Sequence, residues 1–208
     1  MKPEDKDKKE MADQARHDGA FYEIQKPEVF FDSTTGKLLS EQKVTSRKEL
    51  QHLAGVFADE TKRLQLDQSR IVYEVESYFP VADGKKGGLF WGVTKIHPGK
   101  VGDEYFMTRG HFHANADTAE FYWGITGEGV LIRMDKDGNS SAEQVRPHSL
   151  HYIAGCVAHR VVNTGNEPLV FGACWLSDAG HDYETIAQKG FSVRLLEKEG
   201  KPIIVKSE

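Results

Sequence analysis

The sequence contains little that would place the protein in an oxidising compartment or in a membrane. Its two cysteines, Cys156 and Cys174, make no disulfide framework, and neither belongs to a Cys-x-x-Cys pair. No apolar run approaches the roughly 20 residues that a membrane-spanning helix needs. The charged segment 1–10 lacks the apolar centre of a secretory signal. We therefore predict a cytoplasmic protein with reduced cysteines and no membrane partner.

The chain also lacks an excess of positive charge, because its 27 Lys and Arg are outnumbered by 32 Asp and Glu, for a formal net charge of -5. The basic residues are scattered among acids, so we expect no nucleic-acid partner. A length of 208 residues with 38% hydrophobic residues suits one domain of ordinary size. We expect residues 1–20, which are charged and mixed in sign, to form a mobile arm, and residues 21–208 to form a single domain.

Short apolar segments separated by turn signals dominate the sequence from Ile71 onward. The turn signals include Asp83-Gly84, Pro98-Gly99 and Asp137-Gly138. Many short strands with regular punctuation predict a mainly β fold, an antiparallel sandwich or barrel. The expected strands are 21–24, 29–31, 71–75, 89–96, 120–125, 129–134, 150–153, 160–162, 169–175, 191–196 and 202–205.

Two segments are expected to be helical. Residues 46–49, Ser-Arg-Lys-Glu, have the form of a capping box, in which the serine and the glutamate each satisfy an orphan backbone N–H. Apolar residues then recur at helical spacing, which predicts a helix packed on a sheet face; these residues are Leu50, Leu53, Phe57 and Leu64. A second amphipathic piece spans 183–188.

Two histidines, His111 and His113, precede a carboxylate, Glu120, that begins an apolar and aromatic run. His-x-His on an extended strand points both rings to one face, because side chains alternate with a period of two. Glu120 and His159, arriving from two other strands, would complete a site of three imidazoles and one carboxylate for a divalent transition metal. The alternative is that these are solvent-facing or core histidines that bind nothing. The four residues together favour the metal site.

The same segments resemble the motifs of the cupin superfamily. Two motifs are matched: 110–113 with Glu120 and Gly127, and Gly155 with His159 and Asn163. More narrowly, several segments are similar to the cupin-type glucose-6-phosphate isomerases of archaea; they are 98–102, 107–113, 158–160, 163–165 and 178–183. The resemblance runs from about Val72 to the C-terminus. It implies an antiparallel jelly-roll with a few peripheral helices.

The resemblance also implies roles for individual residues. It implies one divalent metal per chain, iron(II) first, with manganese, zinc or nickel also accepted, held by His111, His113, Glu120 and His159. It implies a phosphosugar substrate whose phosphate is bound by Thr94, Thr108, Gly110 and Tyr122. The residues implicated around the sugar and its proton transfers are Glu120, His181 and Tyr183. A homodimer is expected.

Strand alternation tests two of these roles. Tyr122 shares its parity with Glu120, so both should face the site while Phe121 faces the other side. Thr108 and His111 have opposite parity on a regular strand. Both can face one pocket only if the chain bulges, and Gly110 is a residue that permits a bulge.

The expected activity is that of a metal-dependent aldose-ketose isomerase that interconverts glucose 6-phosphate and fructose 6-phosphate, a step of glycolysis and gluconeogenesis. A cupin iron(II) dioxygenase needs the same ligands, and a sugar- or metal-binding cupin without turnover would also keep them. Two chemical routes stay open. In the first, Glu120 leaves the metal and abstracts a carbon-bound proton. In the second, the hydrogen moves as a hydride and Glu120 transfers only hydroxyl protons, because metal ligation lowers the basicity of its carboxylate.

Overall fold

The computed structural model describes residues 24–207 of the chain. The chain divides into two units, Met1–Phe30 and Phe31–Glu208, and the sites discussed below all lie in the second. The arm expected at residues 1–20 lies outside the described residues, as does most of the strand expected at 21–24. Ile24 itself is described and belongs to no strand.

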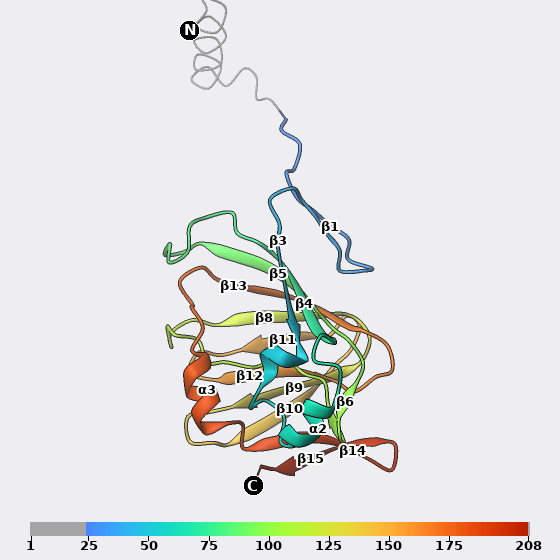
Figure 1. Ribbon diagram of the computed structural model, residues 1–208. Helices are drawn as coiled ribbons and strands as arrows, with labels where there is room; N and C mark the ends of the chain where they lie inside the picture. Colours follow the sequence, from blue (N-terminus) through green and yellow to red (C-terminus); the bar gives the residue numbers. More distant parts are fainter. Residues whose placement is uncertain (1–23, 208) are drawn as a thin grey trace, which may run out of the picture. The chain divides into compact units, whose positions relative to one another are not determined.

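Antiparallel sheets make up most of the second unit (Figure 1). The largest has the order β11-β8-β13-β5-β4-β3; its strands are β3 (Val44–Glu49), β4 (Ile71–Tyr78), β5 (Leu89–Ile96), β8 (Glu120–Thr126), β11 (Leu150–Ile153) and β13 (Leu169–Leu176). A three-stranded sheet follows the order β10 (Ser140–Val145), β9 (Gly129–Met134), β12 (Ala158–Asn163). The mainly β, antiparallel prediction is therefore confirmed, although β10 was not among the expected strands.

Two smaller sheets complete the fold. One pairs β1 (Phe30–Phe31) with β2 (Leu38–Leu39). The other has the order β15 (Lys201–Lys206), β14 (Val193–Lys198), β7 (Glu104–Tyr105), β6 (Lys100–Val101). The helix α3 (Tyr183–Lys189) begins where Asp182 accepts a hydrogen bond from the backbone N–H of Thr185. That helix was expected from the sequence and is confirmed.

Strand β12 lies at the centre of the core and is buried at all six of its residues. One of its edges pairs with β9. The other edge is covered by the segment 106–111, through isolated bridges between Met107 and Val162 and between His111 and His159. This coverage brings the His-x-His segment against β12 and so places the candidate site inside the fold.

The helix expected to start at Ser46 is wrong. Ser46 and Lys48 lie in β3, where they pair with Val75 and Tyr73 of β4. A short 3-10 helix, η1 (Leu50–Leu53), follows, and Gly55 then takes the left-handed conformation with φ of 76°. Cross-strand pairing has overridden the local helical pattern, since tertiary contacts commonly outweigh propensity.

The packing role given to this segment is only partly confirmed. Leu50, Leu53 and Phe57 are buried in the core, but Leu64 is 60% exposed. The capping box exists three residues later than expected, between Glu49 and His52 at the start of η1. A separate helix, α2 (Glu60–Gln65), follows.

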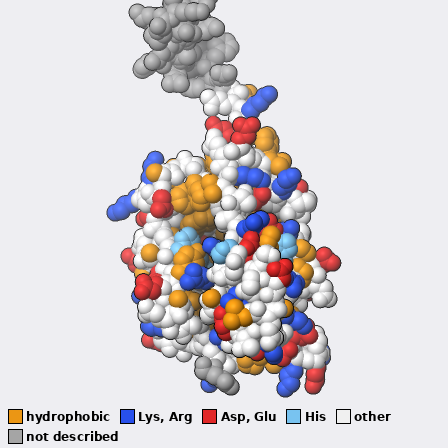
Figure 2. Space-filling model, viewed as in Figure 1, with side chains coloured by type: hydrophobic (Ala, Val, Ile, Leu, Met, Phe, Trp, Pro, Cys, Tyr) orange, Lys and Arg blue, Asp and Glu red, His pale blue; other side chains and the backbone are white. Residues whose placement is uncertain are grey.

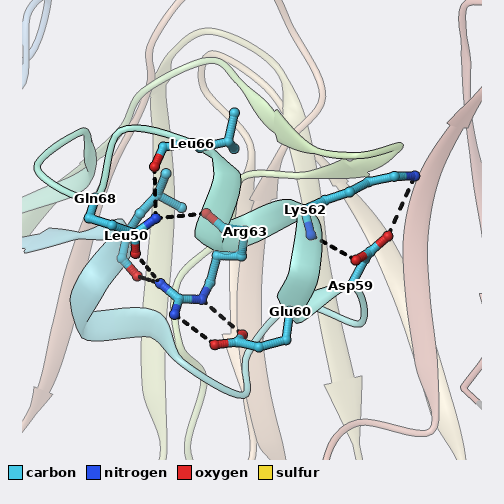
Figure 3. Close-up of polar contacts among 7 residues, drawn as sticks. All are labelled: Leu50, Asp59, Glu60, Lys62, Arg63, Leu66 and Gln68. Atoms are coloured by element: carbon cyan, nitrogen blue, oxygen red, sulfur yellow. Dashed lines mark hydrogen bonds and ion pairs between the residues drawn. The ribbon is translucent and has the colours of Figure 1, made fainter.

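One buried arginine joins α2 to η1 (Figure 3). Arg63 is 3% exposed, and its guanidinium donates to both carboxylate oxygens of Glu60 at 2.8 and 2.6 Å. Its Nη1 donates to the Leu50 carbonyl and to Gln68 Oε1, each at 2.6 Å. Gln68 in turn donates to the carbonyls of Arg63 and Leu66. This network replaces the continuous helix that the apolar spacing had suggested.

Replacing Arg63 with methionine is expected to lower the free energy of unfolding by about 2–3 kcal/mol, because the buried Leu50 carbonyl and the Glu60 carboxylate lose their partner. Urea unfolding followed by circular dichroism measures the loss. Lys62→Met is the matched control on the same helix. Lys62 is more than half exposed and its ion pair with Asp59 spans 3.5 Å, so its loss should cost under about 0.5 kcal/mol. Equal losses in the two variants would contradict this role for Arg63.

The structure also describes both cysteines and the length of each helix. Both cysteines are free, as expected. Within residues 24–207, every helix is too short or too polar to cross a membrane.

Candidate active site

Three imidazoles and one carboxylate converge between the large sheet and β12. His111 and His113 come from the segment before β8, Glu120 is the first residue of β8, and His159 lies in β12. One ligand atom from each residue lies within 4.8 Å of the others. Glu120 Oε1 is 2.5 Å from His159 Nε2 and 3.3 Å from His113 Nε2. The convergence expected from the sequence is present.

The backbone of the His-x-His segment is fixed by two isolated bridges. The His159 N–H donates to the His111 carbonyl at 3.0 Å, and the His111 N–H donates to the His159 carbonyl at 3.3 Å. Phe112, between the two histidines, exchanges both backbone hydrogen bonds with Asp182. The segment pairs only through these isolated bridges and forms no continuous strand. Its side chains still alternate, and the ring centres of His111 and His113 lie 5.7 Å apart.

The hydrogen bonds of two rings show that the cluster suits a cation. His113 Nδ1 lies 3.0 Å from the Thr118 carbonyl, and His159 Nδ1 lies 3.2 Å from the Val157 carbonyl. A carbonyl only accepts, so each Nδ1 carries the proton and each Nε2 of a neutral ring offers a lone pair. Both lone pairs then face Glu120, and the buried His159 Nε2 has no hydrogen-bond partner among the described residues. A divalent ion with nitrogen and oxygen ligands fits this arrangement.

The electrostatics of the cluster point the same way. Burial lowers the pKa of His111 well below its usual value, and the neighbouring His159 and His181 rings lower it further, which keeps the ring neutral. Burial would raise the pKa of Glu120, but its close contacts with the His159 and His113 rings lower it overall. Burial opposes the charged form of His113, yet Glu120 raises its pKa. The cluster thus holds an ionised carboxylate that attracts positive charge.

A cavity of about 640 Å³ opens onto these residues. The sequence-predicted residues that line it are Thr94, Thr108, His111, Glu120, Tyr122, His159, His181 and Tyr183. His113 and Gly110 do not line it. Histidine atoms come to the surface near the middle of the face seen in Figure 2, beside a broad hydrophobic patch.

The bulge expected at Gly110 is present. Gly110 has a φ of 77°, and Thr108 and His111 on either side of it both line the cavity. The Thr108 hydroxyl oxygen accepts the Val161 N–H at 3.1 Å, so its proton remains available to a ligand. Strand alternation also holds on β8, where Tyr122 is 8% exposed on the cavity side and Phe121 is 47% exposed on the other face.

His181 and Tyr183 join the cluster from the start of α3. Their rings stack with a 4° angle between planes, and the His181 ring lies 4.4 Å from that of His111. Burial lowers the pKa of His181, so the ring is neutral at pH 7. Burial raises the pKa of Tyr183. Burial and the Glu120 charge raise the pKa of Tyr122 well above its usual value. Both phenols are therefore hydrogen-bond donors at neutral pH.

Sequence reasoning missed some of the cavity wall. Phe90 and Trp175 form an edge-to-face pair 5.8 Å apart on one side. Ser46 and Lys48 line another side from β3, which had been predicted as the start of a helix. The β-branched Val44-Thr45 pair just before them was the available signal for a strand.

The chain matches known proteins over most of its length. The family described as Glucose-6-phosphate isomerase (GPI) matches residues 47–207. The chain is 41% identical over 175 residues to the glucose-6-phosphate isomerase of Thermococcus kodakarensis, covering 84% of this chain and 90% of that protein. It is 39% identical over 179 residues to the glucose-6-phosphate isomerase of Pyrococcus furiosus, covering 85% and 93%. A solved oxalate decarboxylase from Bacillus subtilis is 18% identical over 65% of this chain and 37% of that chain, with a TM-score of 0.42.

Proposed function

This chain belongs to the glucose-6-phosphate isomerase family, and we propose that it interconverts glucose 6-phosphate and fructose 6-phosphate at a divalent metal held by His111, His113, Glu120 and His159. The observation that supports this most is the buried convergence of those four side chains on a cavity that is also lined by hydroxyl groups. Family membership supplies the reaction, and the cavity supplies room for a phosphosugar.

The hydroxyl groups define the proposed phosphate end. We assign the phosphate to the side chains of Thr94, Thr108 and Tyr122 and to the backbone N–H of Gly110, which does not itself line the cavity but lies between Thr108 and His111, which do. Thr94 lies in β5 and Tyr122 in β8, two strands of the large sheet with β13 between them, and Thr108 lies in the segment that covers β12. Binding energy at this end holds the reacting carbons at a fixed distance from Glu120, which is how remote contacts contribute to rate.

Isomerisation moves a hydrogen between C1 and C2 and shifts the carbonyl, so negative charge develops on O1 and O2. A bound divalent cation would supply Lewis-acid stabilisation of that charge. Glu120 is the proposed acid–base residue for protons at the sugar oxygens, and it is also the carboxylate placed to take a carbon-bound proton. The two routes remain distinct alternatives. The neutral ring of His181, with Tyr183 stacked on it, is assigned to opening the sugar ring.

Several finer assignments complete the proposal. We propose iron(II) as the resident metal, with manganese, zinc or nickel as substitutes, and a homodimer as the working form. We place the protein in the cytoplasm, with glycolysis and gluconeogenesis as its pathways, and treat residues 21–208 as one domain. Metal analysis of protein purified without chelators and light scattering of the purified protein test the first two.

Removing the metal is expected to abolish the isomerisation, because the four side chains alone cannot supply the Lewis-acid stabilisation of the charge that develops on O1 and O2. The measurement is a coupled assay with glucose 6-phosphate or fructose 6-phosphate before and after chelation. Adding back iron(II) or manganese under anaerobic conditions should restore the rate. A rate that survives complete chelation would contradict metal dependence. Oxygen uptake in place of isomerisation would instead identify a dioxygenase, and phosphosugar binding without turnover would identify a binding protein.

A further inference from the structure

One basic side chain lines the cavity and has no part in the assignments above. Lys48 lies in β3, the edge strand of the large sheet. Among the described residues that line this cavity, it is the single lysine or arginine; the acidic ones are Asp83 and Glu120. A phosphosugar that enters such a cavity brings a phosphate with two negative charges, so the charge of this one amine matters.

The strand register places Lys48 near the proposed phosphate end. Ser46 pairs with Val75, and Val75 pairs with Thr94, so these three residues form one cross-strand row on the cavity face. Lys48 is two residues further along β3 and therefore faces the same side. Two strand spacings of about 4.8 Å separate β3 from β5. The flexible four-carbon stem of a lysine can extend across β4 toward a phosphate held at Thr94.

The neighbouring hydroxyl groups cannot supply this charge. Burial raises the pKa of Tyr73 to about 12, and Tyr122 and the threonines are likewise neutral at pH 7. They donate hydrogen bonds but carry no positive charge to set against that of the phosphate. A hydrogen bond from a charged donor is about twice as strong as one between neutral groups.

The residue next to Lys48 offers an internal comparison. Arg47 has the opposite parity on β3, so its side chain points away from the cavity, where it is 64% exposed and its Nε lies 3.2 Å from a Glu49 oxygen. Arg47 is not among the residues that line the cavity. An exposed lysine on an edge strand can also serve only to discourage pairing with other chains. Arg47 would share that general role, whereas Lys48 alone of the two lines the cavity.

We propose that Lys48 is a specificity-determining residue that binds the substrate phosphate through its ammonium group and gives the cavity its preference for phosphorylated over neutral sugars. The inference rests on the proposed isomerase function, and it adds a charged partner to the hydroxyl groups assigned there. Lys48 lies on the exposed side of the cavity, so it also meets the phosphate as the sugar enters.

The test compares Lys48→Met with Arg47→Met, which remove the same charge from adjacent residues on opposite faces of β3. Lys48→Met is expected to raise the KM for glucose 6-phosphate and fructose 6-phosphate about tenfold to a hundredfold, with kcat changed less than about threefold. Inhibition by inorganic phosphate should weaken by a similar factor. Arg47→Met should leave both quantities within about twofold. Lys48→Arg should recover most of the affinity, because it keeps the charge.

Metal content and the far-ultraviolet circular dichroism of all variants should match the unmodified protein, since Lys48 is exposed and contacts none of the four ligands. Equal KM values and equal phosphate inhibition in the two methionine variants would overturn the proposal. If the unmodified protein shows no isomerisation, the proposed function fails separately. Calorimetric titration with inorganic phosphate then decides the role of Lys48: binding weakened only in Lys48→Met supports it, and binding equal to that of Arg47→Met overturns it.

Discussion

Replacing Glu120 with glutamine will lower the isomerase kcat/KM about a thousandfold, the larger part of it in kcat. Glutamine keeps the shape of the side chain but can neither take up a proton nor neutralise a divalent ion. The loss of an acid–base group alone is worth roughly 10²–10⁴ in rate. Glu120 is 5% exposed and faces two imidazoles at 2.5 and 3.3 Å, so no other carboxylate of the cavity can take its place at that point.

Two measurements on Glu120→Gln separate the loss of the acid–base group from the loss of a metal ligand. Coupled kinetics with excess manganese report the acid–base role, and the bound metal after gel filtration reports the ligand role. Glu128→Gln, at an exposed turn position after the same strand, is the control and should change neither quantity. A Glu120→Gln protein that keeps more than about a tenth of the activity would show that the carboxylate is not the acid–base residue.

The strands and most of the imidazole and carboxylate cluster were predictable because both depend on short-range patterns. Alternation along β8 fixes the opposite directions of Phe121 and Tyr122, whatever the rest of the chain does. His111 and His113 are two residues apart, so any extended backbone presents both rings together. His159, a distant residue, was proposed as their partner from its residue type, and the resemblance implied the same role. The structure brings His111, His113 and His159 together with Glu120.

What could not be predicted depends on long-range pairing. The apolar spacing around Leu50 and Leu53 suits a helix, but the pairing of β3 with β4 draws Ser46 and Lys48 into the sheet. Because that segment was assigned to a helix, Lys48 was not considered as a cavity residue. The bridge between Phe112 and Asp182 joins positions about 70 residues apart and delivers His181 to the cluster. No local pattern reports such a contact.

A single methyl group added at Gly110 should damage both the stability of the fold and the position of His111. Its φ of 77° lies in the left-handed region, which costs an alanine about 1 kcal/mol or more. A Cβ there would also lie 2.7 Å from the Phe191 ring and 3.1 Å from Arg160 Cβ. Phe191 and Arg160 are themselves packed together, with the guanidinium carbon 4.0 Å from the ring centre, so neither can easily move aside.

Gly110→Ala is therefore expected to lose about 2–4 kcal/mol of unfolding free energy, from backbone strain plus overpacking. The chain between Arg109 and His111 must shift, although the Arg160 guanidinium holds the Arg109 carbonyl at 2.8 Å. A shift of about 1 Å at His111 would cost roughly a hundredfold in kcat/KM. Urea unfolding and coupled kinetics measure the two effects.

Gly138→Ala isolates the cause of these losses. Gly138 has a similar φ of 85°, but an added Cβ there meets nothing within 4 Å. It should lose only the strain, about 1 kcal/mol, and keep its activity. If Gly110→Ala lost no more than Gly138→Ala in either measurement, the contact with Phe191 and Arg160 would not be what fixes His111. A larger loss of stability and activity in Gly110→Ala than in Gly138→Ala, together with weaker metal retention, would show that the bulge positions His111.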